Sequence, residues 1–237
     1  MNAPQTTTDP DIGQDKILRR YMDLPKLLDL LHHRAIYLRR ADGFADRLEG
    51  ALFPSLRALI DKAHANGQSA HSADDFYRRA RLGNYVSCWT LSGKDSMALW
   101  QLYGGATTSV VVTSTFSGLL QTVSAWNRHV AIRRVKYVDH SRIKTYLVGN
   151  YSDVLTFKHE AYRHEKELRV LVPQQDGNLE SNPMGLRLPV PSLEVLVRSI
   201  VVAPESTPEF YDAVKNLCSR YGLRAPVRRS RLALVPV

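Results

Sequence analysis

A run of β-branched residues at 108–113, with the sequence TSVVVT, constrains the fold of this chain more than any other segment. Val and Thr favour extended backbone, and consecutive apolar positions are typical of a strand that is buried on both faces. We therefore expect a buried strand here. Helices are predicted on either side of it, at residues 94–102 and 119–126.

The remaining predicted strands and helices follow one another irregularly. Strands are expected at residues 17–22, 35–39, 85–91, 130–138, 165–172, 197–202 and 224–232. Helices are expected at residues 24–33, 52–65, 74–82 and 208–221. Because helices do not regularly separate the strands, we expect an α+β fold: a single domain of mixed or antiparallel sheets with flanking helices. The first 15 residues, rich in Thr and Pro, predict a disordered tail, which leaves the single domain to residues 16–237.

Several classes of protein are disfavoured by what the sequence lacks. Neither GxGxxG nor GxxxxGK[ST] occurs, which argues against Rossmann and P-loop enzymes. The histidines show no HExxH spacing, so no metal is predicted. No apolar run reaches the roughly 18 residues of a membrane span, and the polar N-terminus predicts no secretory signal. Two distant cysteines, Cys88 and Cys218, fit buried thiols in a cytoplasmic protein.

The charge balance points to an anionic partner. Lys and Arg number 32 against 23 Asp and Glu, which gives a net charge of +9, and a nucleotide or nucleic acid would complement it. The alternative is surface charge without a specific partner. No feature indicates an oligomeric state. The basic residues form two clusters, one of Arg128, Arg133, Arg134, Lys136, Arg142 and Lys144, and one of Lys215, Arg220, Arg224, Arg228, Arg229 and Arg231.

Three segments place polar or aromatic residues where a core would favour aliphatic ones. In the first, Arg20 lies beside Tyr21 near the end of a strand, where a guanidinium can clamp a phosphate in a bidentate fashion. A structural ion pair of Arg20 with Asp46 or Glu49 is the alternative.

In the second segment, Ser92 or Asp95 could cap the following helix and leave its first N–H groups as an anion site. Trp100 and Tyr103 are three residues apart and would share a helix face. Two such aromatic rings can stack a planar ligand, although packing into the core or its rim is the commoner role of such a pair.

The third segment is HEKELRVLV at residues 164–172. On a strand, Glu165, Glu167 and Arg169 would face one way, while Leu168 and Val170 face the core. Neighbouring carboxylates can have separated pKa values, so that one acts as a base and the other as an electrostatic anchor. The alternative is a ladder of charges on a solvated face.

Several segments together resemble the bacterial family called domain of unknown function 2971. The resemblance runs from about Leu18 to Arg231 and is carried by "RRYMDLPKLLDLLHHRAIYLRRADGFADRLEG", "CWTLSGKDSMALWQLYG", "VKYVD", "HEKELRVL" and "LVRSIVVAPESTPEFYDAVKNLCSRYGL". Members of this family occur in settings that suggest phage defence or toxin-like roles, which the resemblance extends to this chain as an expectation.

A further resemblance is to ADP-ribosyltransferases of the arginine–serine–glutamate type. Those enzymes have an early Arg, a middle Ser/Thr segment and a late Glu-x-Glu, which here are Arg20, residues 90–92 or 113–115, and residues 165–167. The resemblance implies an ADP-ribosyltransferase-like fold and NAD as cofactor. Its implied site residues are Glu167 as the catalytic carboxylate, Glu165 as activator of the acceptor, Ser92 as orienting residue, and Arg20, Tyr21, Trp100, Tyr103 and Arg169 at the cofactor.

Two other functions compete with this interpretation. The basic clusters suit a nucleic-acid-binding or nuclease-like defence component without NAD chemistry. A non-catalytic regulatory module is the other alternative, and there Glu165, Glu167 and Arg169 would form a structural network of ion pairs.

Overall fold

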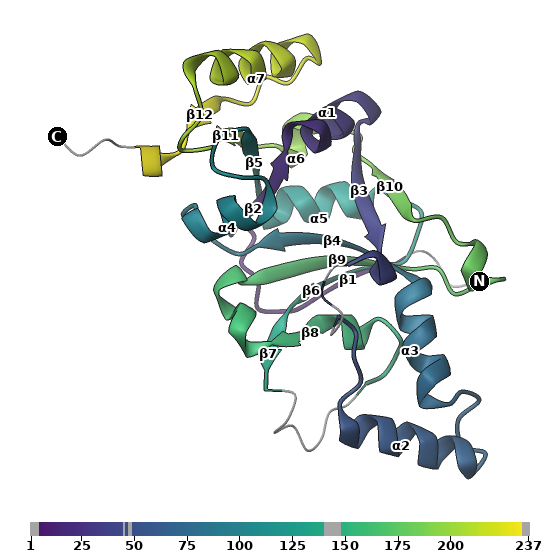
Figure 1. Cartoon of the computed structure of the whole chain (residues 1–237). Helices are drawn as coiled ribbons and strands as arrows, with labels where there is room; N and C mark the ends of the chain where they lie inside the picture. Colours follow the sequence, from purple (N-terminus) through teal and green to yellow (C-terminus); the bar gives the residue numbers. More distant parts are fainter. Residues whose placement is uncertain (1–4, 45, 47–48, 140–147, 234–237) are drawn as a thin grey trace. The chain divides into compact units, whose positions relative to one another are not determined.

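The structure, a computed structural model, describes residues 5–44, 46, 49–139 and 148–233. Its residue contacts divide the chain into two compact units. Unit 1 comprises Met1–Tyr37, Cys88–Arg128 and Arg187–Val237, and unit 2 comprises Leu38–Ser87 and His129–Leu186. Mixed strand pairing and several helices confirm the expected α+β class (Figure 1).

The sheet of unit 1 is built around the β-branched run. Strand β5 (Ser109–Thr115) pairs antiparallel with β2 (Ile17–Asp23) and with β11 (Ser199–Val202), and β12 (Val227–Arg229) adds a parallel pair to β11. The last part of β4 (Asn84–Thr90) also joins β2, with Thr90 opposite Arg19. Val110, Val111 and Val112 are fully buried, as expected for the central strand.

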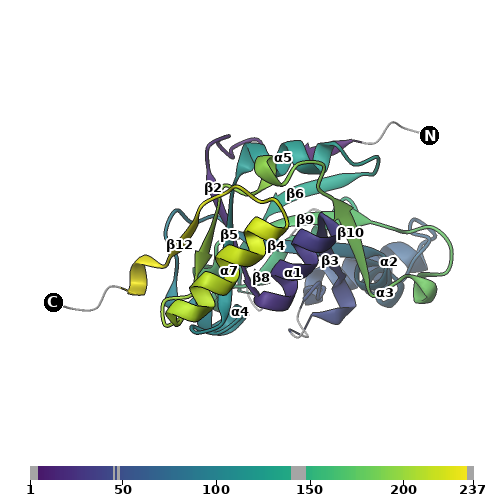
Figure 2. The same cartoon turned by 90° about the horizontal axis from the view of Figure 1, so that it is seen from above.

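The described residues of unit 1 form the α-helices α1 (Leu24–His33), α4 (Met97–Tyr103), α5 (Phe116–Ser124), α6 (Leu193–Leu196) and α7 (Pro208–Arg220). The predicted start of α1 is confirmed, because Asp23 Oδ1 accepts a hydrogen bond from Lys26 N at 2.9 Å and Pro25 lies in the first turn. Helices α1 and α7 lie side by side (Figure 2). The rings of His32 and Tyr221 meet edge to face there, with centroids 6.1 Å apart.

The described residues of unit 2 form several paired strands and the helices α2 (Pro54–Ala65) and α3 (Ala73–Leu82). Strand β6 (Val130–Arg134) pairs antiparallel with β9 (Glu167–Pro173), and the end of β3 (Ala35–Arg40) pairs antiparallel with the start of β4. Strands β7 (Lys136–Val138) and β8 (Phe157–His159) form a small parallel sheet. Strand β10 (Gly185–Pro189) crosses the unit boundary.

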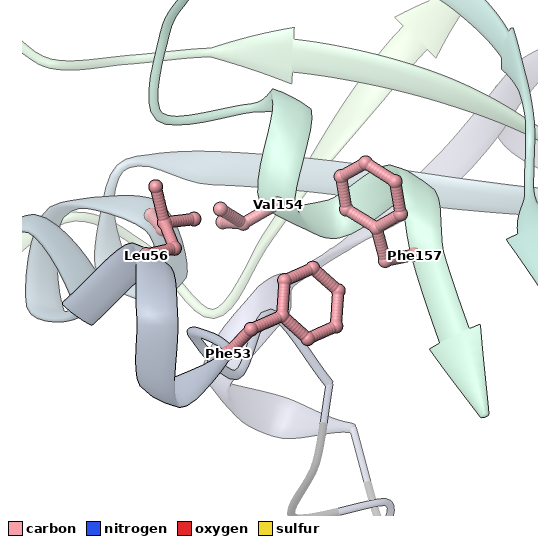
Figure 3. Close-up of a cluster of buried hydrophobic side chains, with 5 residues drawn as sticks. Phe53, Leu56, Val154 and Phe157 are labelled. Carbon is pink, nitrogen blue, oxygen red and sulfur yellow. The ribbon is translucent and has the colours of Figure 1, made fainter. Parts of the chain in front are cut away.

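A compact cluster of apolar side chains supports α2 and α3 in unit 2. Phe53 and Phe157 meet with ring centroids 5.5 Å apart, and Leu56 and Val154 pack beside them (Figure 3). Ala80 of α3 completes the buried set. The cluster therefore links α2 and α3 to the segment that carries β8.

The structure differs from the sequence prediction at several places. Strand β1 (Thr6–Thr8) and the buried side chain of Ile12 lie inside the predicted disordered tail, because β-branched Thr favours extended backbone and Ile12 gains an apolar contact surface. The strand predicted at 130–138 is divided between β6 and β7 at Val135. Helix α4 begins at Met97, three residues later than expected. None of the described helices has the length and apolarity of a membrane span.

Candidate functional site

Strand β2 sends alternate side chains to opposite faces of the unit 1 sheet. Leu18 and Met22 are buried, and Arg20 lies between them on the same face. Arg19 and Tyr21 point to the other face, where both side chains are half-buried. Arg20 and Tyr21, which the sequence placed together at one cofactor, are therefore separated by the sheet.

Arg20 is a half-buried cation. Its Nη2 donates a hydrogen bond to Tyr37 O at 2.8 Å, and its guanidinium lies 5.9 Å from the centre of the Trp89 ring. Among the described residues of unit 1, no carboxylate forms an ion pair with it. Burial lowers the pKa of Arg20 to about 10, an effect that Cys88 and Asp29 oppose. Glu49, one of the two alternative partners expected from the sequence, pairs with Arg169 instead.

Arg19 is held by the loop that precedes α4. Its Nε donates to Ser92 O at 3.1 Å and its Nη2 donates to Gly93 O at 2.8 Å. The Ser92 hydroxyl donates to Lys94 O at 2.7 Å within its own turn. The hydroxyl proton of Ser92 is thus engaged, and it is the carbonyl of Ser92 that positions a charged side chain.

The expected helix cap is different in the structure. Ser96 is the N-cap residue of α4 and makes no side-chain capping bond, and its N–H donates to the Tyr21 hydroxyl at 2.9 Å. Asp95 accepts a hydrogen bond from the hydroxyl of Ser230. The capping role predicted for Ser92 or Asp95 is therefore wrong, because both side chains bond elsewhere.

The two aromatic side chains of α4 have different surroundings. Trp100 is 0% exposed and packs with Val111, Val201 and Ala203, with the Tyr21 ring edge-on at 5.1 Å. Tyr103 is 39% exposed. Trp100 therefore has the packing role that the sequence analysis gave as the commoner one, and in this structure its ring offers no open face for stacking.

The second candidate hydroxyl segment, residues 113–115, has structural contacts. Thr113 Oγ1 donates to Ser199 O at 3.0 Å and so joins β5 to β11. Thr115 Oγ1 accepts from Gly118 N at 3.0 Å and caps α5. These bonds fix the pairing of β5 with β11 and the first turn of α5.

In unit 2 the predicted charged residues form a buried network around Arg169. Arg169 Nε and Nη2 donate to Glu167 Oε2 at 2.9 and 2.6 Å, and Nη1 donates to Glu49 and to the Leu155 carbonyl. Lys158 Nζ donates to Glu165 Oε2 at 2.6 Å and lies 3.7 Å from Glu167 Oε1. The five charged residues of this network are between 1% and 8% exposed. The alternative of a solvated ladder of charges is therefore wrong.

The network holds three carboxylates and two cations, all of them buried. Burial raises the pKa of Glu49 above its usual range, although Arg169 opposes the shift. Burial alone would lower the pKa of Lys158, but Glu167 and Glu165 raise it. Tyr137 completes the network, because its hydroxyl accepts from Glu167 N at 2.7 Å, and burial raises its pKa too. No sequence pattern predicted the part played by Lys158 and Tyr137, or the pairing of Glu49 with Arg169.

A left-handed residue separates the two predicted carboxylates. Glu165 ends a 3₁₀ turn, Lys166 has φ 48° and ψ 48°, and β9 begins at Glu167. A residue with a Cβ pays about 1–2 kcal/mol in this conformation. This turn, in place of the regular strand expected over residues 165–172, carries both carboxylates to Lys158.

Replacing Lys166 with Gly should therefore stabilise the protein or leave it unchanged, within about 0.5 kcal/mol. The relieved backbone strain offsets the roughly 0.5–1 kcal/mol of extra chain entropy that a Gly loses on folding. Urea unfolding of Lys166→Gly measures this, with Arg163→Gly in the preceding turn as the matched control, expected to destabilise by about 0.5–1 kcal/mol. An equal loss in both variants would contradict the prediction.

The basic cluster near the C-terminus is exposed on unit 1. All six of its side chains reach solvent, and Arg228 and Arg229 lie on β12. The guanidinium of Arg229 lies 4.8 Å from the centre of the Tyr211 ring. In the other cluster, Arg142 and Lys144 lie outside the described residues. Within the described ranges, no group of three or more His, Cys, Asp or Glu side chains could hold a metal ion.

Comparison with known proteins gives few matches. No family model matches this sequence, and no curated protein matches it. The chain is similar to DarT from Thermus sp. 2.9 in complex with ADP-ribosylated ssDNA, with 12% identity, a TM-score of 0.45 and coverage of 93% of this chain and 96% of that chain. It is also similar to the same DarT in complex with NAD+, with 10% identity, a TM-score of 0.44 and coverage of 94% and 100%. The likeness to domain of unknown function 2971 stays a resemblance.

Proposed function

We propose that the protein binds NAD and transfers ADP-ribose to an acceptor, as an ADP-ribosyltransferase-like effector in phage defence or a toxin-like role. One observation carries this proposal. Two consecutive residues of β2, Arg19 and Arg20, point to opposite faces of the sheet, and each guanidinium has only carbonyl acceptors among the described residues, so each is a candidate to bind an anion. A cation without a carboxylate partner favours an anionic ligand, and the guanidinium fork matches phosphate oxygens.

Glu167 supplies the carboxylate in this proposal. Arg169 and Lys158 hold it from two sides, so its negative charge is fixed before a ligand arrives. Preorganised charge of this kind stabilises a developing positive charge more effectively than a mobile side chain does. The bond between ribose and nicotinamide breaks with its electron pair leaving on nicotinamide. The acceptor then bonds to the ribose carbon and gives its proton to Glu165.

The test combines NAD titration by calorimetry with measurement of nicotinamide release. Wild type, Glu167→Gln and the surface control Glu180→Gln are compared, each first shown to be folded by circular dichroism. We expect the rate of nicotinamide release to fall at least about 100-fold in Glu167→Gln, the effect of losing one preorganised electrostatic group. The NAD affinity of Glu167→Gln should stay near that of wild type, and Glu180→Gln should match wild type in both measurements. Wild-type protein that neither binds NAD nor releases nicotinamide contradicts the proposal.

Two other candidates are supported by particular observations. The burial of Glu165 and Glu167 in ion pairs favours the non-catalytic regulatory module, in which the network is structural. The exposed arginines of β12 favour a nucleic-acid partner. The same assays run with single-stranded DNA and with RNA at low and high salt separate these candidates, because phosphate contacts give binding that weakens steeply with salt. Salt-sensitive binding without nicotinamide release would favour the nucleic-acid component without NAD chemistry.

A further inference from the structure

The guanidinium of Arg19 is fixed along one edge and open along the other. Nε and one N–H of Nη2 donate to the carbonyls of Ser92 and Gly93. The opposite edge, formed by Nη1 and the second N–H of Nη2, has no partner among the described residues of unit 1. A guanidinium edge offers two parallel N–H groups, which is the geometry that binds two oxygens of one phosphate. The loop at Ser92 and Gly93 therefore fixes the Arg19 guanidinium so that its open edge lies on the half-buried face of the sheet.

Tyr21 lies on the same face as Arg19, two positions along β2. Its hydroxyl oxygen accepts from Ser96 N at 2.9 Å, which leaves its own proton to be donated. Burial raises the pKa of Tyr21 to about 12, so the hydroxyl keeps this proton at neutral pH. The buried ring of Trp100 meets Tyr21 edge-on and restricts its orientation. Tyr21 is therefore a second fixed donor beside the Arg19 fork.

The surroundings of this face differ from those of Arg20. Exposed Lys94 belongs to the same loop and adds positive charge, while Asp95, whose carboxylate accepts from the Ser230 hydroxyl, adds a negative charge near Tyr21. Arg20 lies on the opposite face between the buried side chains of Leu18 and Met22. Its hydrogen bond to Tyr37 O and its contact with Trp89 are packing interactions of that face.

We propose that Arg19 and Tyr21, rather than Arg20, form an oxyanion site of unit 1 that binds a phosphate or diphosphate ester. The identity of that ester as NAD rests on the proposed function, whereas the site itself is independent of it. In this site, Arg19 binds two oxygens of the phosphate and Tyr21 donates to a third. Ser92 and Gly93 act as positioning residues through their carbonyl groups.

The test is calorimetric titration of inorganic pyrophosphate, and separately of NAD, at low salt. The variants are Arg19→Gln, Tyr21→Phe and Arg20→Gln, with Lys26→Gln as a surface control whose ion pair with Asp23 is exposed. We expect Arg19→Gln to weaken pyrophosphate binding about 10- to 100-fold and Tyr21→Phe to weaken it about 3- to 10-fold, as for charged and neutral hydrogen bonds respectively. Arg20→Gln and Lys26→Gln should stay within about 2-fold of wild type.

Folding and ligand identity are controlled separately. Circular dichroism first shows that each variant is folded to the same extent as wild type. Arg19→Lys keeps the charge but lacks the guanidinium fork, so it should retain only part of the wild-type affinity for pyrophosphate. Pyrophosphate binding that depends on Arg20 and not on Arg19 would overturn the site. Arg19-dependent pyrophosphate binding without NAD binding would support the site and count against the proposed function. Equal binding of both pyrophosphate and NAD by wild type and Arg19→Gln would overturn the site and leave the proposed function standing.

Discussion

Replacing Arg169 with Met should lower the free energy of unfolding by about 3–5 kcal/mol, because the change leaves buried carboxylates without their cation. Arg169 is 1% exposed and joins Glu49, Glu167 and the Leu155 carbonyl. Met fills a volume similar to that of Arg. The loss of unfolding free energy therefore comes mainly from the missing charge and its hydrogen bonds, and little of it comes from a cavity. Lys158 would remain as a cation beside Glu167, but Glu49 would lose its ion-pair partner.

Urea unfolding at neutral pH measures this loss, and Arg57→Met is the matched control within unit 2. Arg57 pairs with Asp74 at 2.7 Å on the surface, so its replacement should cost no more than about 1 kcal/mol. Acid provides a second check. A protonated carboxyl group needs no cation beside it. The loss of unfolding free energy in Arg169→Met, relative to wild type, should therefore shrink as the pH falls through the raised pKa of Glu49. Equal losses for the two variants would show that the network contributes little.

Replacing Gly118 with Ala should lower the free energy of unfolding by about 1–3 kcal/mol, the usual cost of forcing extra atoms into a packed interior. Gly118 is in α5, where Ala is ordinarily the more favourable residue by about 1 kcal/mol. A Cβ at this position would collide with the backbone carbonyl of Val195 in α6, and it would lie 3.1 Å from Thr115 Oγ1. Because a carbonyl in a packed helix cannot rotate away, the clash outweighs the propensity.

Thermal and urea unfolding of Gly118→Ala test this prediction against Gly13→Ala. A Cβ at Gly13 meets nothing within 4 Å, so that variant should differ from wild type by less than about 0.5 kcal/mol. Stabilisation by Gly118→Ala would mean that α5 and α6 are not packed as closely as described.

The elements that sequence alone predicted well are those with local signals. Helix α1 has a capping Asp23, an early Pro25 and leucines at helical spacing, and all of these lie within one short segment. Strand β5 follows from its β-branched residues. The helix α6 and the strands β8 and β10 are too short to show a period, and the start of α4 depends on a bond from Ser96 to the distant Tyr21. Such non-local bonds leave no local pattern.

The candidate site divides in the same way. The spacing of Glu165, Glu167 and Arg169 marked them as unusual, but their partners could not be found by pattern, since Glu49 is 120 residues from Arg169 in the chain. To decide whether Arg19 or Arg20 binds the ligand, one must know which face of β2 each side chain occupies. That face follows from the buried neighbours of Arg20, and the pattern of β2 could have revealed it, because Leu18 and Met22 alternate with Arg20.

The segmented make-up of the two units has a consequence for how the chain folds as it leaves the ribosome. Unit 2 has all its residues once Leu186 is made, whereas unit 1 takes its third segment from Arg187 onward. Until β11 is synthesised, one edge of the apolar strand β5 has no partner to cover it. Pairings of such high contact order form slowly, and an uncovered strand edge invites association with other chains. Unit 1, which carries the proposed oxyanion site, is therefore completed after unit 2 and is more exposed to aggregation during synthesis.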